Sequence, residues 1–320
     1  MPHKTSSTPT TPMTATHTPW IGVDWGTTHR RGYALAADGT CTTEASDDQG
    51  ALTTRGRHAE SLAAWLPALG APVDGHVVMS GMVGSAFGWQ EAPYLGPDVP
   101  LEALPQHLVH LEGHPQRYIV PGYCVHDVAG QPDVMRGEET QLLGAVAMGL
   151  RNGWFVLPGT HSKWVLLRDG RVEQLRTYMT GELFALLSTN GTLAAAAQTP
   201  QTAAGTEPLW SQPAFADGVA AGAPGALAHQ LFACRARVVT GTMPANQALA
   251  YLSGLLIGSE LQDVLQDLDK SGSDQFHLIG SPALAEAYQV AARQLGSALT
   301  LLSPRDVILS GFHYIQTHKA

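Results

Sequence analysis

An aspartate followed by a glycine and two threonines stands at the end of a short apolar run. Residues 21–28 read IGVDWGTT, which predicts a strand that delivers Asp24 into a turn. Gly26 lets the backbone approach a ligand closely, and backbone N–H groups with the hydroxyls of Thr27 and Thr28 can donate to phosphate oxygens. An ionised Asp24 would repel phosphate, so we expect it beside a hard cation such as Mg²⁺. The alternative is an ordinary hairpin turn with a solvated aspartate, because short motifs match by chance.

The same kind of unit occurs again about half a chain later. Residues 154–157 are apolar, residues 158–163 read PGTHSK, and a second apolar run leads to Asp169-Gly170. Asp-Gly between two apolar runs is a strong hairpin signal, and the first unit has the same turn at Asp38-Gly39. The repetition indicates an internal duplication. Two equivalent halves that face each other would place two phosphate loops across one cleft, with the metal carboxylate on one side only.

Size and charge narrow the class of protein. A chain of 320 residues can bury a substantial core, and two domains are the natural expectation. The net charge is −9 and the sequence has no clustered Lys/Arg run, which argues against nucleic acid as a partner. No apolar stretch reaches the ~18 residues of a membrane span, so we expect no membrane partner.

The cysteine content and residues 1–19 indicate the cell compartment in which the protein works. The three cysteines, Cys41, Cys124 and Cys234, have no metal-ligand spacing, and a sparse, odd count fits reduced thiols in a cytoplasmic protein. Residues 1–19 are rich in Thr, Pro and Ser and lack the apolar core of a secretory signal. We interpret them as a disordered tail.

Two glutamates open a predicted helix in the first half of the chain. Glu138 and Glu139 follow Arg136 and Gly137, and the apolar residues from Leu142 onward are spaced as on a helix. Acidic residues in a first turn complement the helix dipole and need no further role. Adjacent helix positions point about 100° apart, so only one of the two glutamates can aim squarely into a cleft.

Several other junctions are typical of ligand sites or of packing in α/β proteins. A buried strand at 76–82 runs into a glycine-rich loop at 83–89, a common ligand position. Thr180, followed by an acidic residue, suits a helix cap. A strand at 276–280 meets Ser281 and a proline, which predicts a helix start and a credible nucleotide contact. The small residues of the run 253–258 favour close helix packing.

Six segments, taken in order, carry a resemblance to a known family. They are residues 24–28, 82–85, 134–142, 157–164, 179–183 and 252–258. The chain resembles the 2-dehydro-3-deoxygalactonokinases, sugar-acid kinases of the actin, hexokinase and heat-shock ATPase superfamily. The resemblance runs from about residue 20 to the end, and its long segments are specific, whereas the D-x-G-T motif is common to the superfamily.

This resemblance implies an α/β fold of two RNase H-like domains, a duplicated mixed sheet with flanking helices, around a nucleotide cleft. Residues 20–150 would form the N-terminal domain with the first phosphate loop and the sugar-acid pocket. Residues 151–320 would form the C-terminal domain with the second phosphate loop and the adenosine site. The implied reaction is phosphorylation of 2-dehydro-3-deoxy-D-galactonate at its C6 hydroxyl by ATP with Mg²⁺, in galactonate catabolism. The oligomeric state stays open, with a homodimer among the alternatives.

The resemblance also implies roles for individual residues. Related kinases place an aspartate base after a glycine before the second phosphate motif, and here Glu138 fills that slot, with Glu139 left open. Met82, Val83, Gly84, Trp89 and Arg136 would contact the sugar acid, with Tyr94 as a further wall. The nucleotide would be held by Gly26, Thr27, Thr28, Gly159, Thr160, His161, Lys163, Gly280 and Ser281, and the metal by Asp24.

Some of these roles have plain alternatives. Lys163 could offset charge on the transferred group or be a solvated loop lysine. Arg136 could pair with the substrate carboxylate or form a salt bridge to a neighbouring glutamate. Trp89 and Tyr94 could wall the sugar pocket or pack in the core. Two other functions also stay open: a kinase of a different 2-keto-3-deoxy sugar acid, and a nucleotide-dependent sugar-acid sensor or ATPase. The paired glutamates favour a kinase, because a sensor requires no base.

Overall fold

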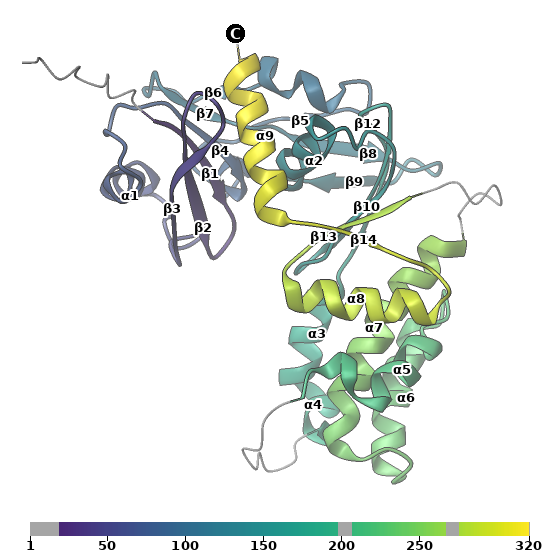
Figure 1. Ribbon diagram of the computed structural model, residues 1–320. Helices are drawn as coiled ribbons and strands as arrows, with labels where there is room; N and C mark the ends of the chain where they lie inside the picture. The colour runs from purple at the N-terminus through teal and green to yellow at the C-terminus, as the bar shows by residue number, and fades with distance from the viewer. Residues whose placement is uncertain (1–18, 198–206, 267–274, 320) are drawn as a thin grey trace, which may run out of the picture.

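The computed structural model describes residues 19–197, 207–266 and 275–319. The predicted tail, apart from residue 19, lies outside the described residues. The chain forms two large mixed sheets, a smaller third sheet and flanking helices (Figure 1). None of the helices within the described ranges is long and apolar enough to cross a membrane.

The first sheet is built around the strand that ends in the Gly-Thr turn. Its order is β3-β2-β1-β4-β7-β6, with β1 antiparallel to β2 and parallel to β4. The strands are β1 (Trp20–Trp25), β2 (Arg30–Leu35), β3 (Cys41–Asp47), β4 (Val77–Gly81), β6 (Val109–His110) and β7 (Arg117–Ile119).

The second sheet repeats this plan, as the two hairpin units predict. Its order is β12-β11-β10-β13-β14, with β10 antiparallel to β11 and parallel to β13. The strands are β10 (Gly153–Leu157), β11 (Ser162–Arg168), β12 (Arg171–Tyr178), β13 (Phe276–Ile279) and β14 (Thr300–Leu302). The predicted mixed α/β fold with a duplicated sheet is confirmed.

Successive side chains of a strand point to opposite faces of the sheet, so each central strand contributes to two apolar layers. In β1, Ile21 and Val23 pack with α1 (His58–Trp65), whereas Trp20 points to the opposite layer. In β10, Val156 packs towards the helices of the second half, whereas Phe155 joins the layer that contains Trp20. The two sheets therefore enclose a common apolar layer.

Two helices fill that common layer. They are α2 (Glu138–Ala147) and α9 (Pro304–His318), which lie side by side (Figure 1). Gly144 and Gly311 meet at their contact, where neither has room for a Cβ. Phe312 of α9 packs on Trp20, at 6.2 Å between ring centroids. The expected second domain, residues 151–320, therefore ends in a helix that packs against the first sheet.

The remaining helices cover the far face of the second sheet (Figure 1). Helices α5 (Pro213–Ala221) and α7 (Ala248–Gln266) pack closely, because Gly254 of α7 faces the Phe215 carbonyl of α5 and leaves no room for a Cβ. The run of small residues at 253–258 predicts this close packing. These helices are α3 (Thr180–Thr189), α4 (Gly191–Ala197), α5 (Pro213–Ala221), α6 (Leu227–Val239), α7 (Ala248–Gln266) and α8 (Pro282–Gln294). The small third sheet, β5-β8-β9, consists of β5 (Tyr94–Leu95), β8 (Gly122–His126) and β9 (Pro132–Met135), and β9 leads directly into Arg136.

Candidate active site

The two Gly-Thr loops line one cavity of about 540 Å³. It lies where β1, β4, β10 and β13 end and where α2 and α8 begin. The structure thus brings together most of the predicted site residues: Asp24, Gly26, Thr27, Met82, Tyr94, Arg136, Glu138, Gly159, Thr160, His161, Lys163, Gly280 and Ser281.

The first Gly-Thr loop is held from behind by its carbonyl groups. The carbonyls of Gly26, Thr27 and Thr28 accept hydrogen bonds from the backbone of residues 50–52 at 2.9 to 3.2 Å. A Cβ on Gly50 would collide with the loop, so the close approach depends on that glycine. Thr28 is exposed and does not line the cavity.

Asp24 lies in the cavity wall and carries a perturbed carboxyl group. Burial raises its pKa to about 6, Arg31 opposes the rise and the Glu138 carboxylate adds to it. A cation beside Asp24 would favour its ionised form and so offset both burial and the Glu138 charge. Among the residues that the structure describes, no cluster of three His, Cys, Asp or Glu could hold a metal by itself. Mg²⁺ typically takes one or two carboxylates together with substrate phosphates and water, so Asp24 fits that kind of site.

Of the two glutamates, only Glu138 lines the cavity. Its Oε2 accepts from the Arg136 backbone N–H at 3.1 Å, and burial raises its pKa while the Lys163 charge opposes the rise. Glu139 is 0% exposed; it accepts from the Gly137 N–H at 2.7 Å and from the Ser80 hydroxyl at 3.2 Å. Burial, reinforced by the Glu138 charge, raises the pKa of Glu139 to about 8.

Arg136 lines the cavity, and two of its three guanidinium nitrogens form no hydrogen bond within the described residues. Its Nη2 donates to the Ala92 carbonyl at 2.7 Å, and the group lies 4.3 Å from the centre of the Tyr94 ring. Its Nε and Nη1 are buried without a hydrogen-bond partner in the described part of the chain. Gly84 makes room for this side chain, since a Cβ there would lie 3.0 Å from Nη1. Buried donors without partners are costly; because Arg136 lines the cavity, a small shift of its guanidinium would let it bind an acceptor such as a carboxylate.

Lys163 is not a solvated loop lysine. It is only 8% exposed, and its Nζ donates to the Val134 carbonyl at 2.7 Å and to the Thr177 hydroxyl at 2.8 Å. These bonds hold the ammonium group against the cavity that contains Glu138.

The start of α3 is locked to the second Gly-Thr loop. The Glu182 N–H donates to the Thr160 carbonyl at 2.9 Å, and the Glu182 carboxylate lies 2.6 Å from His161 Nε2. A Cβ on Gly181 would collide with the Gly159 carbonyl. The predicted cap role of Thr180 is wrong, because Met179 occupies the cap position and the Thr180 hydroxyl donates elsewhere, to a buried carboxylate described below.

Four predicted residues besides Thr28 do not line the cavity: Val83, Gly84, Trp89 and Glu139. A tight turn over Met82–Gly84 reverses the chain after β4, and the Trp89 N–H donates to the Val83 carbonyl at 2.8 Å. Trp89 then packs in the core, with ring centroids 6.5 Å from Trp25 and 5.0 Å from His114.

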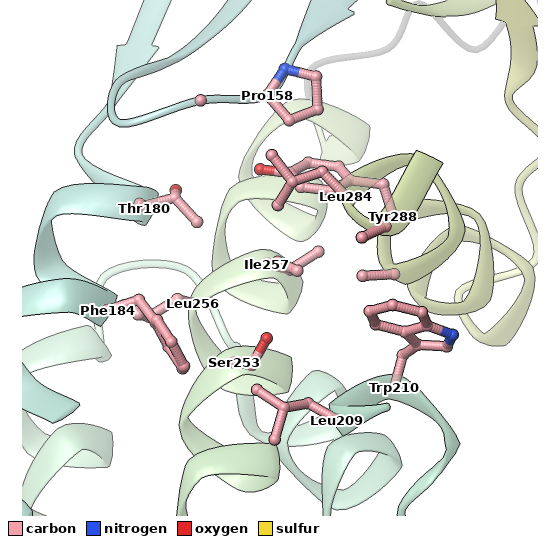
Figure 2. Close-up of a pocket in the computed structure, with 14 residues that line it drawn as sticks. Pro158, Thr180, Phe184, Leu209, Trp210, Ser253, Leu256, Ile257, Leu284 and Tyr288 are labelled. Carbon is pink, nitrogen blue, oxygen red and sulfur yellow. The ribbon is translucent and has the colours of Figure 1, made fainter. Parts of the chain in front are cut away.

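Sequence reasoning missed a second cavity of about 170 Å³ that adjoins the second Gly-Thr loop. Figure 2 shows Phe184 of α3 on one side, Leu284 and Tyr288 of α8 on the other, and Ile257 of α7 between them. Its lining is mostly apolar and includes Gly159 of the loop. Apolar residues at helical spacing predict only packing, so no motif could have revealed this cavity. Arg31 and Gln141, which line the main cavity, were also missed.

Comparisons with known proteins agree on one family. The family described as 2-keto-3-deoxy-galactonokinase matches residues 24–315. The 2-dehydro-3-deoxygalactonokinase of Escherichia coli (strain K12) is 34% identical over 298 residues, covering 92% of this chain and 97% of that protein. A solved structure from Sinorhizobium meliloti, provisionally named a 2-dehydro-3-deoxygalactonokinase protein, has a TM-score of 0.82 at 32% identity and covers 93% of this chain and 95% of its own. Component A of the Acidaminococcus fermentans (R)-2-hydroxyglutaryl-CoA dehydratase is similar in fold alone, with a TM-score of 0.50 at 10% identity, 94% of this chain covered and 99% of the other.

Proposed function

Since the chain belongs to the 2-keto-3-deoxy-galactonokinase family, we propose that it transfers the γ-phosphoryl group of ATP to the C6 hydroxyl of 2-dehydro-3-deoxy-D-galactonate. Membership makes it a phosphotransferase that acts on a sugar acid. The observation that carries the finer proposal is the arrangement of the main cavity. The two Gly-Thr loops, Asp24, Glu138 and Arg136 all line one space.

The nucleotide would span the two cavities. Backbone N–H groups and hydroxyls of the loops at Gly26 and Gly159 would hold the phosphates. The adjoining apolar cavity would take the adenine ring, which places the base between α3 and α8 (Figure 2). Gly280 and Ser281 lie at the start of α8, where the helix N-terminus favours an anionic group.

Asp24 would hold Mg²⁺ together with the phosphates. When bound, the ion would neutralise negative charge on the phosphates. Lys163 would add a second positive charge from the opposite wall. Phosphoryl transfer depends mainly on such positioning and charge stabilisation.

The sugar acid would lie beside Arg136 and Tyr94. The guanidinium group of Arg136 would bind the carboxylate, which would fix the far end of the substrate. The C6 oxygen then attacks the γ-phosphorus, the bond to the bridging oxygen breaks, ADP leaves, and Glu138 takes the hydroxyl proton. The raised pKa of Glu138 brings this base closer to neutral pH.

Arg136 would recognise any 2-keto-3-deoxy acid by the same carboxylate, so a kinase of a related acid is the alternative. We also propose that the chain divides into two domains near residue 150 and that the reaction serves galactonate catabolism. The protein would work in the cytoplasm, where its free thiols, Cys41, Cys124 and Cys234, stay reduced.

A coupled assay for ADP release tests the proposal. Purified protein with ATP, Mg²⁺ and a panel of 2-keto-3-deoxy acids should release ADP fastest with the galactonate derivative and form a 6-phospho product. ADP release at the same rate without any sugar acid would refute the kinase assignment in favour of an ATPase. A higher kcat/KM for a different acid would change the substrate and keep the class.

A further inference from the structure

A fully buried carboxylate, Glu260, lies in the helical layer behind the second Gly-Thr loop. It belongs to α7 and is only 1% exposed. Its Oε1 accepts from the Trp164 indole N–H at 2.5 Å, and its Oε2 accepts from the Thr180 hydroxyl at 2.5 Å and the Tyr288 hydroxyl at 2.9 Å. The Tyr288 hydroxyl also lies 2.7 Å from that of Ser162. One side chain therefore joins β11, α3, α7 and α8.

The partners of Glu260 belong to the two places that would hold the nucleotide. Thr180 and Tyr288 line the apolar cavity from opposite sides (Figure 2). Ser162 is the first residue of β11 and directly follows His161, a loop residue that lines the main cavity. The carboxylate thus connects both walls of the apolar cavity to the end of the second Gly-Thr loop.

The energetics do not favour a carboxylate here for stability alone. Burying a charge is costly unless it is fully hydrogen-bonded, and well-packed apolar groups often stabilise a core as well as a buried polar network. Burial raises the pKa of Glu260, and hydrogen bonds from four side chains oppose that rise: Thr180, Trp164, Tyr288 and Ser162. What the network adds over apolar packing is direction, because each hydrogen bond fixes the orientation of its donor.

We propose that Glu260 is a positioning residue for the nucleotide. It holds the two cavity walls and the loop in one arrangement, so that the base and the phosphates are bound at a fixed spacing. This inference rests on the proposed function, because it takes the apolar cavity and the loop as parts of one nucleotide site.

The test compares three variants in ADP binding by calorimetry and in steady-state kinetics. Glu260→Gln keeps the shape but loses the charge and one acceptor. Tyr288→Phe removes only one hydroxyl, which donates to Glu260 and lies beside the Ser162 hydroxyl. Tyr178→Phe is the matched control: it removes a hydrogen bond of 2.5 Å to Asp263, one turn further along α7, and lines neither cavity.

We expect Glu260→Gln to raise the ADP Kd and the KM for ATP about tenfold or more, since hydrogen bonds to charged groups contribute about that much. Tyr288→Phe should shift both in the same direction by a smaller factor, and it serves as the test should Glu260→Gln not fold. Tyr178→Phe should leave the ADP Kd unchanged. The KM for the sugar acid should stay within about twofold in all three, because Arg136 and Glu138 are untouched.

Three outcomes would overturn the inference. A folded Glu260→Gln with wild-type ADP affinity would show that the network only stabilises the core. An equal loss of ADP affinity in Tyr178→Phe would show a general effect of loosening α7. A wild type that binds no ADP would overturn both this inference and the proposed function, whereas one that binds ADP but transfers no phosphate would refute the kinase reaction alone.

Discussion

The sharpest consequence of the site geometry is an unequal response of the two adjacent glutamates to the same substitution. Glu138 lines the main cavity, whereas Glu139 is buried against Ser80 and Gly137. Glu138→Gln keeps an oxygen that can accept the Arg136 N–H, so the turn should survive while the proton acceptor is lost. We expect kcat to fall about 10²-fold or more, with the KM for ATP nearly unchanged, because a base acts mainly in the transition state.

For Glu139 the magnitude follows from its pKa of about 8. With its pKa raised to about 8, the Glu139 carboxyl is mostly protonated at pH 7. Gln therefore replaces a group that is already mostly neutral, and kcat should change by less than about threefold.

Glu139 should instead affect stability as a function of pH. Its pKa is raised from 4.5 to about 8 on folding, so the folded state holds this proton more tightly than the unfolded state does. The resulting stabilisation is complete below pH 4.5 and is lost as pH rises through 8. The wild-type Tm should therefore fall over this range more steeply than that of Glu139→Gln.

Steady-state kinetics and thermal unfolding from pH 5 to 9 would check both variants. Equal, small losses of kcat would show that both glutamates serve only the helix start and that the base lies elsewhere. A large loss from Glu139→Gln alone would reverse the assignment and refute the argument from burial.

Three other substitutions probe separate parts of the site. Asp24→Asn should lower kcat at least about 10²-fold with the Tm preserved, because its charge would hold the metal; near-normal turnover at saturating Mg²⁺ would contradict this. Arg136→Gln should raise the KM for the sugar acid about tenfold or more while sparing the KM for ATP, and an unchanged sugar-acid KM would remove Arg136 from the binding role. Leu284→Trp should fill the apolar cavity and raise the KM for ATP without affecting the sugar acid; if ATP and GTP kinetics both stay at wild-type values, the base does not bind there.

The structural elements that the sequence predicts are those determined by interactions between residues close together in the chain. Asp38-Gly39 and Asp169-Gly170 fix their hairpins within a few residues, so both repeated units follow from sequence. Thr180 was predicted as a cap because that role needs only neighbours, but its true partner, Glu260, lies 80 residues away in the chain. The glycine-rich loop was expected in the cleft, yet its tight turn directs Trp89 into the core. Long-range partners decide such cases, and a single sequence does not show them.

The return of α9 to the first sheet has a consequence for biosynthesis. Phe312 packs against Trp20 of β1 and Tyr33 of β2, which are synthesised more than 270 residues before it. Until residues 304–318 leave the ribosome, the inner face of the first sheet and the partner face of α2 stay uncovered. The apolar layer between the two sheets therefore cannot be completed until α9 has been made. Contacts between segments so far apart in the chain also slow folding.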